Sequence, residues 1–251
     1  MLIRVIRGKH TLPSNHVRYK VNFSSRSYEK ELLDRDDIPF EDIKLNMHEL
    51  DIINKRLGGH QINIGAVKSM VRHYSFQQPI VIAEIGCGGG DNLRALYFWC
   101  KRNNITANFI GIDINPHCIA YASANNEIPE ARWIVSDYRD MNFDQKPTII
   151  FSSLFCHHFT EDQLSDMLGW MKSNSALGFF INDLHRHWLA YHSIRLITAA
   201  FSSSYLVRND APLSVRRGFT RKDWETLMRK VGIERYTIQW KWAFRWLITV
   251  N

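Results

Sequence analysis

A glycine-rich segment follows a strongly apolar run and is the clearest candidate for ligand chemistry in the chain. Residues 86–90 have the sequence Gly-Cys-Gly-Gly-Gly, and an acid, Glu84, stands two residues before the first glycine. Glycine lets the backbone turn sharply and approach a ligand without a Cβ in the way. The loop of a dinucleotide fold, spaced Gly-x-Gly-x-x-Gly, holds a pyrophosphate at a helix N-terminus. A carboxylate at position 84 is unfavourable beside a pyrophosphate, so the segment favours a ligand with an ammonium group.

Two further acids stand where the next strands are expected to end. Asp113 closes an apolar run over residues 107–112, and Asp137 follows another over residues 132–135. An acid at the first position can accept hydrogen bonds from both ribose hydroxyls of a nucleoside. An acid at the second can accept from an adenine amino group, with the ring of Tyr138 beside it. The loop and the two acids together predict a nucleoside ligand.

Histidines follow the fourth and fifth expected strands. The fourth leads into His157 and His158, and the fifth into Asp183, His185 and His187. Because the carboxyl ends of parallel strands open on one crevice, we expect both segments to face it. A phenol has a pKa of about 10 and histidine about 6.5, so a nearby imidazole can act as a general base. Asp183 could orient that imidazole and fix its tautomer.

Each histidine also has a structural interpretation, since a single histidine near a strand end is commonly a hydrogen-bonded core residue. If the fourth segment stays extended, His157 and His158 face opposite sides, so at most one of them reaches a substrate. His185 and His187 would face one side. No regular ligand spacing points to a metal, and we expect none.

The elements that position these groups alternate along the chain. Short, continuous apolar runs are typical of strands buried on both faces of a parallel sheet, and the periodic segments between them predict helices. We expect strands at 80–85, 107–112, 132–135, 148–154 and 176–182, and helices at 91–101, 116–124 and 162–172. This alternation predicts an α/β fold with an open, doubly wound parallel sheet.

Helical patterns precede this core. Residues 27–58 and 62–76 carry apolar residues at mixed three- and four-residue spacing, which predicts two helices. Gly58 and Gly59 end the first as a helix stop should.

The chain closes with helical and strand patterns. Residues 188–201 predict an amphipathic helix, and Thr220 with Asp223 resembles a capping box for a helix that ends near Gly232. Two aromatic runs, at 235–240 and 244–250, predict a hairpin added to one edge of the sheet.

Basic residues gather at two places in this chain of 251 residues and net charge +7. Residues 1–20 carry five Lys/Arg and no acid, and residues 208–245 carry ten against four acids. We take residues 1–26 as a basic lead segment, with a transit peptide as the alternative. A basic patch can attract RNA or acidic substrates, and its simplest interpretation is a solvated surface.

The cysteines and the hydropathy of the chain indicate the compartment in which we expect the protein. The four cysteines include no Cys-x-x-Cys pair, which suits reduced thiols in a cytosol rather than disulfides or zinc. No apolar run approaches the roughly 18 to 20 residues of a membrane span. We expect a soluble, cytoplasmic protein.

On these motifs the chain resembles the class I S-adenosylmethionine-dependent methyltransferases, including small-molecule enzymes related to those of quinone biosynthesis. The resemblance covers residues 78–182 and is carried by Glu84-x-Gly86-x-Gly88-x-Gly90, Gly111-Ile112-Asp113, Ser136-Asp137 and Ser152-Ser153-Leu154-Phe155-x-His157-His158. It implies a Rossmann-like, seven-stranded sheet with an antiparallel last strand. It also implies S-adenosylmethionine as cofactor, held by Glu84, Gly86, Cys87, Gly88, Asp113, Ile114, Asp137, Tyr138 and Ser153. A related histidine turn in the quinone enzymes favours His158 over His157 as the base.

A second resemblance covers roughly residues 180–232, which look like a bacterial branch associated with polyketide or phenolic secondary metabolism. It implies that the helix from Trp188 and a loop to Phe219 form a lid over the acceptor pocket. His185, Arg186, Arg208 and Arg216 would then bind an acidic group or stabilise a phenolate. The alternative for each arginine is a surface ion pair with a nearby acid, which contributes little.

We therefore expect one methyltransferase domain over residues 27–251, made of a helical cap (27–77), a cofactor-binding core (78–182), a lid insertion (183–219) and a last helix with a hairpin (220–251). The leading function is O-methylation of a small phenolic or aromatic acceptor, polyketide- or quinol-like, with His158, His157 and Asp183 as catalytic candidates. The alternatives are an RNA methyltransferase and a non-catalytic cofactor-binding subunit. Against RNA, the chain lacks an Asn-Pro-Pro-Tyr-type turn after the fourth strand, where Ser153-Leu154-Phe155-Cys156 stands.

Overall fold

The computed structural model describes residues 21–35, 37–72 and 78–251. Most of the predicted basic lead segment and the end of the predicted 62–76 helix lie outside these residues. Within the described residues, no helix combines the length and apolarity that a membrane crossing requires.

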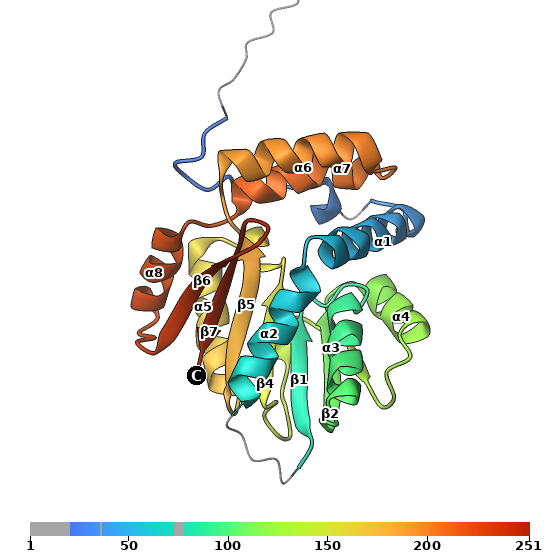
Figure 1. Cartoon of the computed structure of the whole chain (residues 1–251), viewed down its shortest axis with the longest axis vertical. Coiled ribbons are helices and arrows are strands. Elements are labelled where there is room, and N and C mark those ends of the chain that lie inside the picture. The colour runs from blue at the N-terminus through green and yellow to red at the C-terminus, as the bar shows by residue number, and fades with distance from the viewer. Residues whose placement is uncertain (1–20, 36, 73–77) are drawn as a thin grey trace, which may run out of the picture.

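A seven-stranded sheet forms the centre of the molecule, with the strand order β3-β2-β1-β4-β5-β7-β6 (Figure 1). The strands β1 to β5 run parallel, while β7 pairs antiparallel with both β5 and β6. Their bounds are β1 Ile80–Ile85, β2 Ala107–Asp113, β3 Arg132–Val135, β4 Ile149–Ser153, β5 Gly178–Leu184, β6 Tyr236–Lys241 and β7 Arg245–Val250. The predicted doubly wound sheet, with its hairpin on one edge, is confirmed.

Continuous apolar sequence explains why β1 and β4 occupy the middle of the sheet. Every residue of β4 is buried, and so are all residues of β1 except Val81. The rings of Phe151 on β4 and Phe180 on β5 stack with centroids 4.8 Å apart on one face of the sheet. A strand buried on both faces needs helices on both sides, and the chain supplies them.

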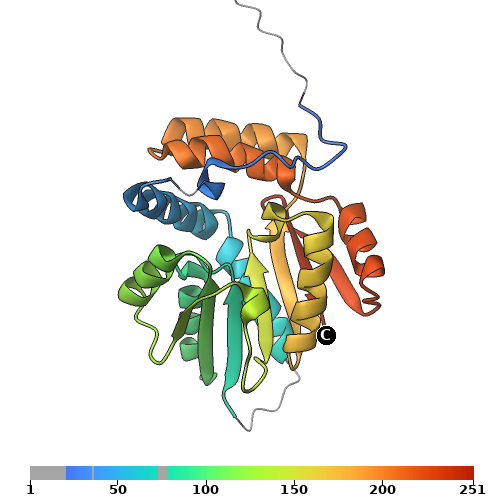
Figure 2. The same cartoon turned by 180° about the vertical axis from the view of Figure 1, so that it is seen from behind.

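Helices cover both faces of the sheet and one of its ends (Figures 1 and 2). The first face carries α2, α3 and α4, and the opposite face carries α5, while α6, α7 and α1 lie across the end at which the parallel strands finish. The bounds are α1 Phe40–Arg56, α2 Gly59–Val71, α3 Asp91–Arg102, α4 Pro116–Asn125, α5 Glu161–Asn174, α6 Trp188–Phe201, α7 Tyr205–Arg217 and α8 Arg221–Lys230. Short 3₁₀ turns occur at η1 Leu32–Asp34, η2 Tyr138–Asp140 and η3 Cys156–His158.

Two sequence-based expectations about this end are wrong. The segment predicted as a loop up to Phe219 contains α7, which Ser204 caps by accepting a hydrogen bond from the Val207 amide, and which contains Pro212. Its polar sequence and proline hid the helix, because a proline removes one helical hydrogen bond without always ending the helix. The first helix begins at Phe40 rather than at residue 27, since Pro39 precedes it and disfavours helical geometry in the residue before.

Candidate active site

The glycine loop between β1 and α3 makes a tight turn whose inner side is packed by aromatic rings. Gly86 and Gly90 have φ values of 68° and 77°, in the left-handed region that favours glycine. A Cβ on Gly86 would lie 2.3 Å from the Phe155 ring, and one on Gly90 would lie 2.4 Å from the Trp133 ring. These two glycines are therefore required by the close packing of the loop against the protein itself.

The loop is open at Gly88, and Asp113 at the end of β2 holds it there through the backbone. A Cβ on Gly88 would meet nothing within 4 Å, so a ligand can approach there. Asp113 accepts hydrogen bonds from the amides of Gly88 (2.8 Å) and Asn115 (2.9 Å). Burial raises the pKa of Asp113 above its ordinary value. The carboxylate thus fixes the loop and stands at the strand end predicted for a ribose contact.

Glu84 is a fully buried acid with unused hydrogen-bonding capacity. One of its oxygens accepts a hydrogen bond from the Asn92 side chain at 2.8 Å, while the other, Oε2, has no hydrogen-bond partner among the described residues. Burial raises the pKa of Glu84 well above its usual range, and the nearby Asp91 adds to the effect. A buried carboxylate with a free oxygen fits the ammonium group of the predicted cofactor, because the cation would lower the cost of its charge.

Three other predicted cofactor residues lie at the edge or inside of this crevice. Asp137 bonds the Arg139 guanidinium at 2.6 Å and accepts from the Arg139 amide at the start of η2. Ile114 is 71% exposed, as expected for an apolar side chain that a ligand could cover. Tyr138 instead points inward, where its ring packs edge-on against Trp170. The Tyr138 ring therefore lies in the core rather than open to the crevice.

Cys87 and Ser153 are both buried rather than open to the crevice. The Cys87 sulfur packs against Gly111, where an added Cβ would lie 3.0 Å from it. The Ser153 hydroxyl oxygen accepts hydrogen bonds from the side-chain amides of Asn63 (3.3 Å) and Asn182 (3.4 Å). Both residues support the strand ends from within.

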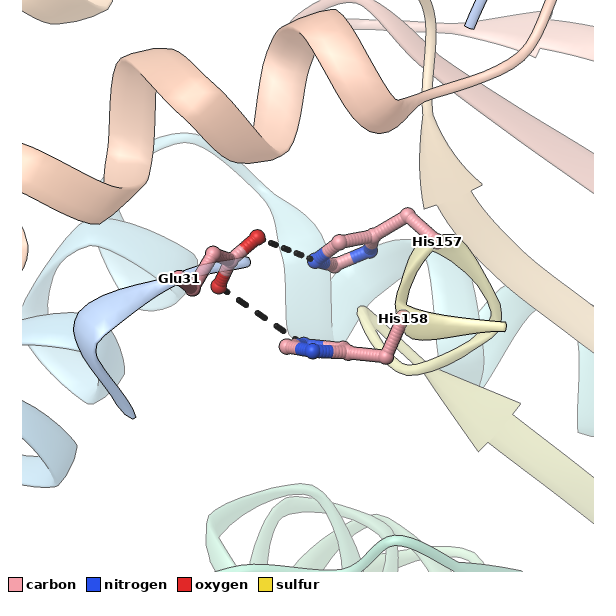
Figure 3. Close-up of side chains that lie close together, drawn as sticks. All are labelled: Glu31, His157 and His158. Atoms are coloured by element: carbon pink, nitrogen blue, oxygen red, sulfur yellow. Dashed lines mark ion pairs between the residues drawn. The ribbon is translucent and has the colours of Figure 1, made fainter. Parts of the chain in front are cut away.

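His157 is a buried histidine held by a carboxylate at the end of β5. Its Nδ1 lies 2.8 Å from Asp183 Oδ1. Its Nε2 points toward Glu31, at 3.7 Å from Oε1 (Figure 3). Burial alone would raise the pKa of Asp183, but the neighbouring His157 and two hydrogen bonds bring it below its ordinary value. The predicted partnership of an imidazole with Asp183 is present, and it involves His157.

His158 lies against a different acid but turns toward the same glutamate. Its Nδ1 is 2.9 Å from Asp34 Oδ1, and its Nε2 is 3.8 Å from Glu31 Oε2. The expectation that the two adjacent histidines face opposite sides is wrong, because residues 156–158 form a 3₁₀ turn rather than an extended segment. Both rings converge on Glu31, as Figure 3 shows.

Glu31 reaches this position because α7 holds the segment that carries it. Ser214 donates to Glu31 Oε1 at 2.8 Å. Asp210 accepts from the amides of Leu32 (2.8 Å) and Leu33 (3.0 Å), which fixes the turn η1. Burial raises the pKa of Glu31, while His158, Ser214 and Arg217 oppose the rise. None of these contacts joins residues close in sequence.

Arg217 ties the cluster to the backbone of the histidine turn. It donates to the carbonyl oxygens of His157 (3.1 Å) and His158 (3.0 Å), and pairs with Asp34 at 2.8 Å. Its neighbour Arg216, the predicted substrate residue, points outward to Glu29 at 3.0 Å. The prediction for Arg216 is therefore wrong, and the adjacent arginine supplies the cation of this site.

The other predicted arginines also serve the fold. Arg186 is buried and donates to the carbonyl oxygens of Phe23 and Gly218 and to Asp223, so it joins the end of β5 to the start of α8. Arg208 donates to the carbonyl oxygen of Ser202 at 2.7 Å. The buried Arg186 thus uses its donors on protein atoms, which contradicts its predicted role in binding an acidic substrate, whereas Arg208 is exposed and, among the described residues, uses only its Nε donor.

His185 and His187 lie at the end of β5 but do not line the cavity beside His157. The Trp240 indole donates to His185 Nδ1 at 3.3 Å, and burial lowers the pKa of His185 to about 4. His187 caps α6 by accepting from the Leu189 amide at 3.2 Å. The two rings do face one side, with centroids 5.3 Å apart. The expectation that all four histidines share one crevice is wrong.

A cavity of about 370 Å³ lies above the His157 turn, enclosed by α1, α6, α7 and the β6–β7 turn. Its polar lining includes Glu31, His157 and His158. Most of the remaining wall is apolar, with Leu50 and Ile53 from α1 and Ile194 from α6 among its members. Such a cavity suits a largely apolar molecule with one polar group.

A short segment connects the glycine loop to this cavity. The Phe155 ring contacts Gly86, while Leu154 before it and His157 after it line the cavity. Leu154 has a φ of 54°, an uncommon value for a residue with a branched side chain, and strain of this kind concentrates at functional sites. The nucleoside crevice and the cavity are therefore neighbours across the end of β4.

Glu31, His157 and His158 have the composition of a possible metal site, and so do Asp51, His60 and Asp91 near the start of α3. In the first cluster the Arg217 guanidinium lies 3.7 Å from Glu31 and already supplies a positive charge. In the second, His60 lies 2.9 Å from Asp51, which also pairs with Arg94. Protein cations thus compensate the acids of both clusters.

Sequence reasoning missed the residues that assemble the histidine cluster: Glu31, Asp34, Asp210, Ser214 and Arg217. No local sequence signal marked them, because acids and arginines are usually exposed and these residues are buried only through contacts with distant segments. Arg26, assigned to the lead segment, is another such residue. It is buried and donates to the carbonyl oxygens of Arg217 and Phe159. The packed part of the chain therefore begins before residue 27.

Comparison with known proteins defines the class. Residues 82–174 match the model of a family described as a methyltransferase domain. The match spans the glycine loop, Asp113, Asp137 and the histidine turn, and it leaves out the segments that carry Glu31 and Arg217. No curated protein sequence matches the chain.

Solved structures of methyltransferases share the whole fold at low sequence identity. The plantazolicin methyltransferase BpumL, in complex with S-adenosylhomocysteine, is 16% identical with a TM-score of 0.62, and the match covers 86% of this chain and 92% of that chain. Magnesium protoporphyrin IX methyltransferase from Synechocystis, also with S-adenosylhomocysteine, is 14% identical with a TM-score of 0.52, over 79% and 86%. Human N-acetylserotonin methyltransferase, with S-adenosylmethionine, is 11% identical with a TM-score of 0.61, over 84% and 56%.

The family match and the fold agree with the crevice described above. The chain has the class I methyltransferase fold, and residues 82–174 match a methyltransferase domain. Both findings agree with the S-adenosylmethionine-dependent methyltransferase that the glycine loop and its acids predicted.

Proposed function

We propose that the protein transfers a methyl group from S-adenosylmethionine to the hydroxyl oxygen of a small phenolic or aromatic acceptor bound in the cavity above the His157 turn. The observation that carries the proposal is a buried histidine, paired with Asp183 at 2.8 Å, that lines a largely apolar cavity. The cavity lies beside Phe155, whose ring packs on the glycine loop. An apolar wall suits an aromatic ring, and one polar corner suits its hydroxyl.

The residues for the cofactor fit that ligand. Gly88 leaves room for it, Glu84 offers a buried free oxygen to its ammonium group, and Asp113 stands at the ribose position. Asp137 and Ile114 would flank the adenine. When bound, S-adenosylmethionine supplies an electron-poor methyl group on a sulfonium.

We assign the base to His157 rather than to the His158 that the resemblance favoured. With Nδ1–H donated to Asp183, the free lone pair lies on Nε2, on the side of Glu31 and the cavity. Nε2 takes the hydroxyl proton as the oxygen forms its bond to the methyl carbon and the sulfur–methyl bond breaks. Asp183, held at low pKa, stabilises the resulting imidazolium, while His158 and Glu31 position the ring.

The proposed arrangement gives each segment a role. Residues 78–182 bind the cofactor, α6 and α7 form the lid of the acceptor cavity, and the N-terminal segment supplies both Glu31 and the cavity wall of α1. The last helix and the hairpin complete a single domain. The four cysteines are buried and unpaired, which supports a cytoplasmic setting. The small, apolar cavity favours a small molecule over a nucleic acid.

Calorimetry with S-adenosylmethionine, followed by measurement of S-adenosylhomocysteine release over a panel of phenols, tests this function. The parent protein should bind the cofactor and turn over at least one phenol. Asp113→Ala should lose most of the cofactor affinity, whereas Asp144→Ala, at a site on the opposite end of the sheet, should retain it. Equal affinity in the Asp113 variant would contradict the assigned crevice, and cofactor binding without turnover of any phenol would contradict the acceptor class.

A further inference from the structure

The acceptor cavity adjoins a second hollow between α1 and α6. This groove, of about 260 Å³, is lined by one side of α1 and by the C-terminal half of α6. The cavity and the groove share three lining residues, Ile53, Leu57 and Ile197. Three aliphatic side chains, one face of each to the cavity and the other to the groove, thus form a wall that the two hollows share.

The outer end of the groove exposes apolar side chains to solvent. Phe201 is 85% exposed and Ile52 39% exposed, and both line it. The two helices are joined beyond this point by Glu49 of α1, which accepts from the amides of Ser203 (2.8 Å) and Ser204 (3.1 Å) after the end of α6. These hydrogen bonds fix the distance between α1 and α6 at this end. The apolar sides of the two helices face each other across the groove.

We infer that the acceptor is an amphiphile whose aliphatic chain runs from the cavity through the groove between α1 and α6. The inference rests on the proposed function, since the polar head is the group presented to His157. The chain would lie on Ile53, Leu57 and Ile197 and emerge between Ile52 and Phe201. This occupant covers the exposed apolar residues of the groove, which otherwise meet water at a cost of about 25 cal/mol per Å².

The dimensions of the groove set a limit on the chain. From Glu49 to Leu57, the residue after α1, the groove wall spans nine residues, which is a rise of about 12 Å at helical geometry. Each methylene buried along this length should strengthen binding about threefold to fourfold. Once the chain passes Phe201 it enters solvent, so the gain should stop.

Turnover of a series of 4-alkylphenols, from methyl to octyl and kept below micellar concentrations, tests the inference. The parent kcat/KM should rise about threefold with each methylene up to octyl, because an octyl chain is shorter than the groove wall, and affinity measured by calorimetry should rise in parallel. Ile52→Trp fills the groove from a position that does not line the cavity. It should bring the octyl-to-methyl ratio close to one in both measurements.

Leu196→Trp is the matched control, because Leu196 is 72% exposed and lines neither hollow. It should keep the parent ratio. A parent ratio near one, or equal ratios in the Ile52 and Leu196 variants, would overturn the inference even if phenols are methylated. If no phenol is methylated but affinity still rises with chain length and falls in Ile52→Trp, the groove assignment stands and the proposed reaction fails.

Discussion

The ends of β4 and β5 each carry a pair of histidines, and the two pairs have different surroundings. At the end of β4, His157 and His158 both turn toward the buried Glu31 and line the cavity. At the end of β5, His185 receives a hydrogen bond from Trp240 and His187 caps α6. The strands are neighbours and run parallel, so their position in the sheet does not explain the difference.

The difference arises from what packs on each end. The N-terminal segment and α7 cover the β4 end and bring Glu31, Asp34 and Arg217 to it. The β6–β7 hairpin covers the β5 end with aromatic rings, including Trp246 at 4.9 Å from the His185 ring centroid. Acidic partners can orient an imidazole and stabilise its charged form, whereas burial lowers the pKa of His185 and disfavours that form.

Removing one histidine from each pair should have the largest effect. His157→Ala should lower kcat by about 10²- to 10⁴-fold, because the general base is lost. His185→Ala should remain within a few-fold of the parent. Release of S-adenosylhomocysteine measures both. Similar losses in the two variants would remove the functional distinction between the strand ends.

The adjacent arginines offer the next test of what holds the β4 end together. Arg217→Met should lower the free energy of unfolding by about 2–4 kcal/mol, because it removes a buried charged donor shared by two carbonyl oxygens and Asp34. Arg216→Met, which breaks an outward ion pair with Glu29, should change it by less than about 0.5 kcal/mol. Denaturant titrations compare them. If the two changes were equal, Arg217 would not organise the cluster.

The pH dependence of the free energy of unfolding should show whether His185, at the β5 end, is neutral in the folded protein. Because the pKa of His185 is lowered to about 4 in the fold, the folded protein binds fewer protons than the unfolded chain below the ordinary value of 6.5. The parent should therefore lose stability as the pH falls from about 6.5 to 4. His185→Gln should show a shallower loss in thermal unfolding over that window, and an unchanged slope would mean that His185 is not neutral in the fold.

Chelation should have the smallest effect. Because Arg217 compensates Glu31 and His157 is paired with Asp183, we expect the β4 cluster to work without a metal ion. Turnover after treatment with a chelator should match that of untreated enzyme, measured before and after adding back zinc or magnesium. A loss that only a metal restores would make Glu31, His157 and His158 ligands instead of a base and its supports.

Much of the fold could be predicted from local sequence. The apolar run at Ile80–Ile85, the glycine loop and the acid at Asp113 specify a strand, a turn and a strand end by patterns a few residues long. The hairpin that ends the chain was likewise visible in its aromatic runs. These features depend on neighbours in sequence, so periodicity and turn chemistry suffice.

The histidine cluster depends instead on contacts between distant segments. Glu31 meets Ser214 across 183 positions, and Arg217 meets His157 across 60. The choice between Arg216 and Arg217 is set by the helical phase of α7, a helix that its Pro212 and polar residues concealed. No local pattern carries such information, which is why the predicted substrate residues were misplaced.

The most direct test is a crystal structure of the protein with S-adenosylhomocysteine and a phenol that it methylates. We predict the phenol in the cavity between α1, α6 and α7, with its hydroxyl oxygen about 2.6–3.2 Å from His157 Nε2. A phenol bound beside His185, or one in the cavity with its hydroxyl directed away from His157, would contradict the assignment of the β4 end as the catalytic one.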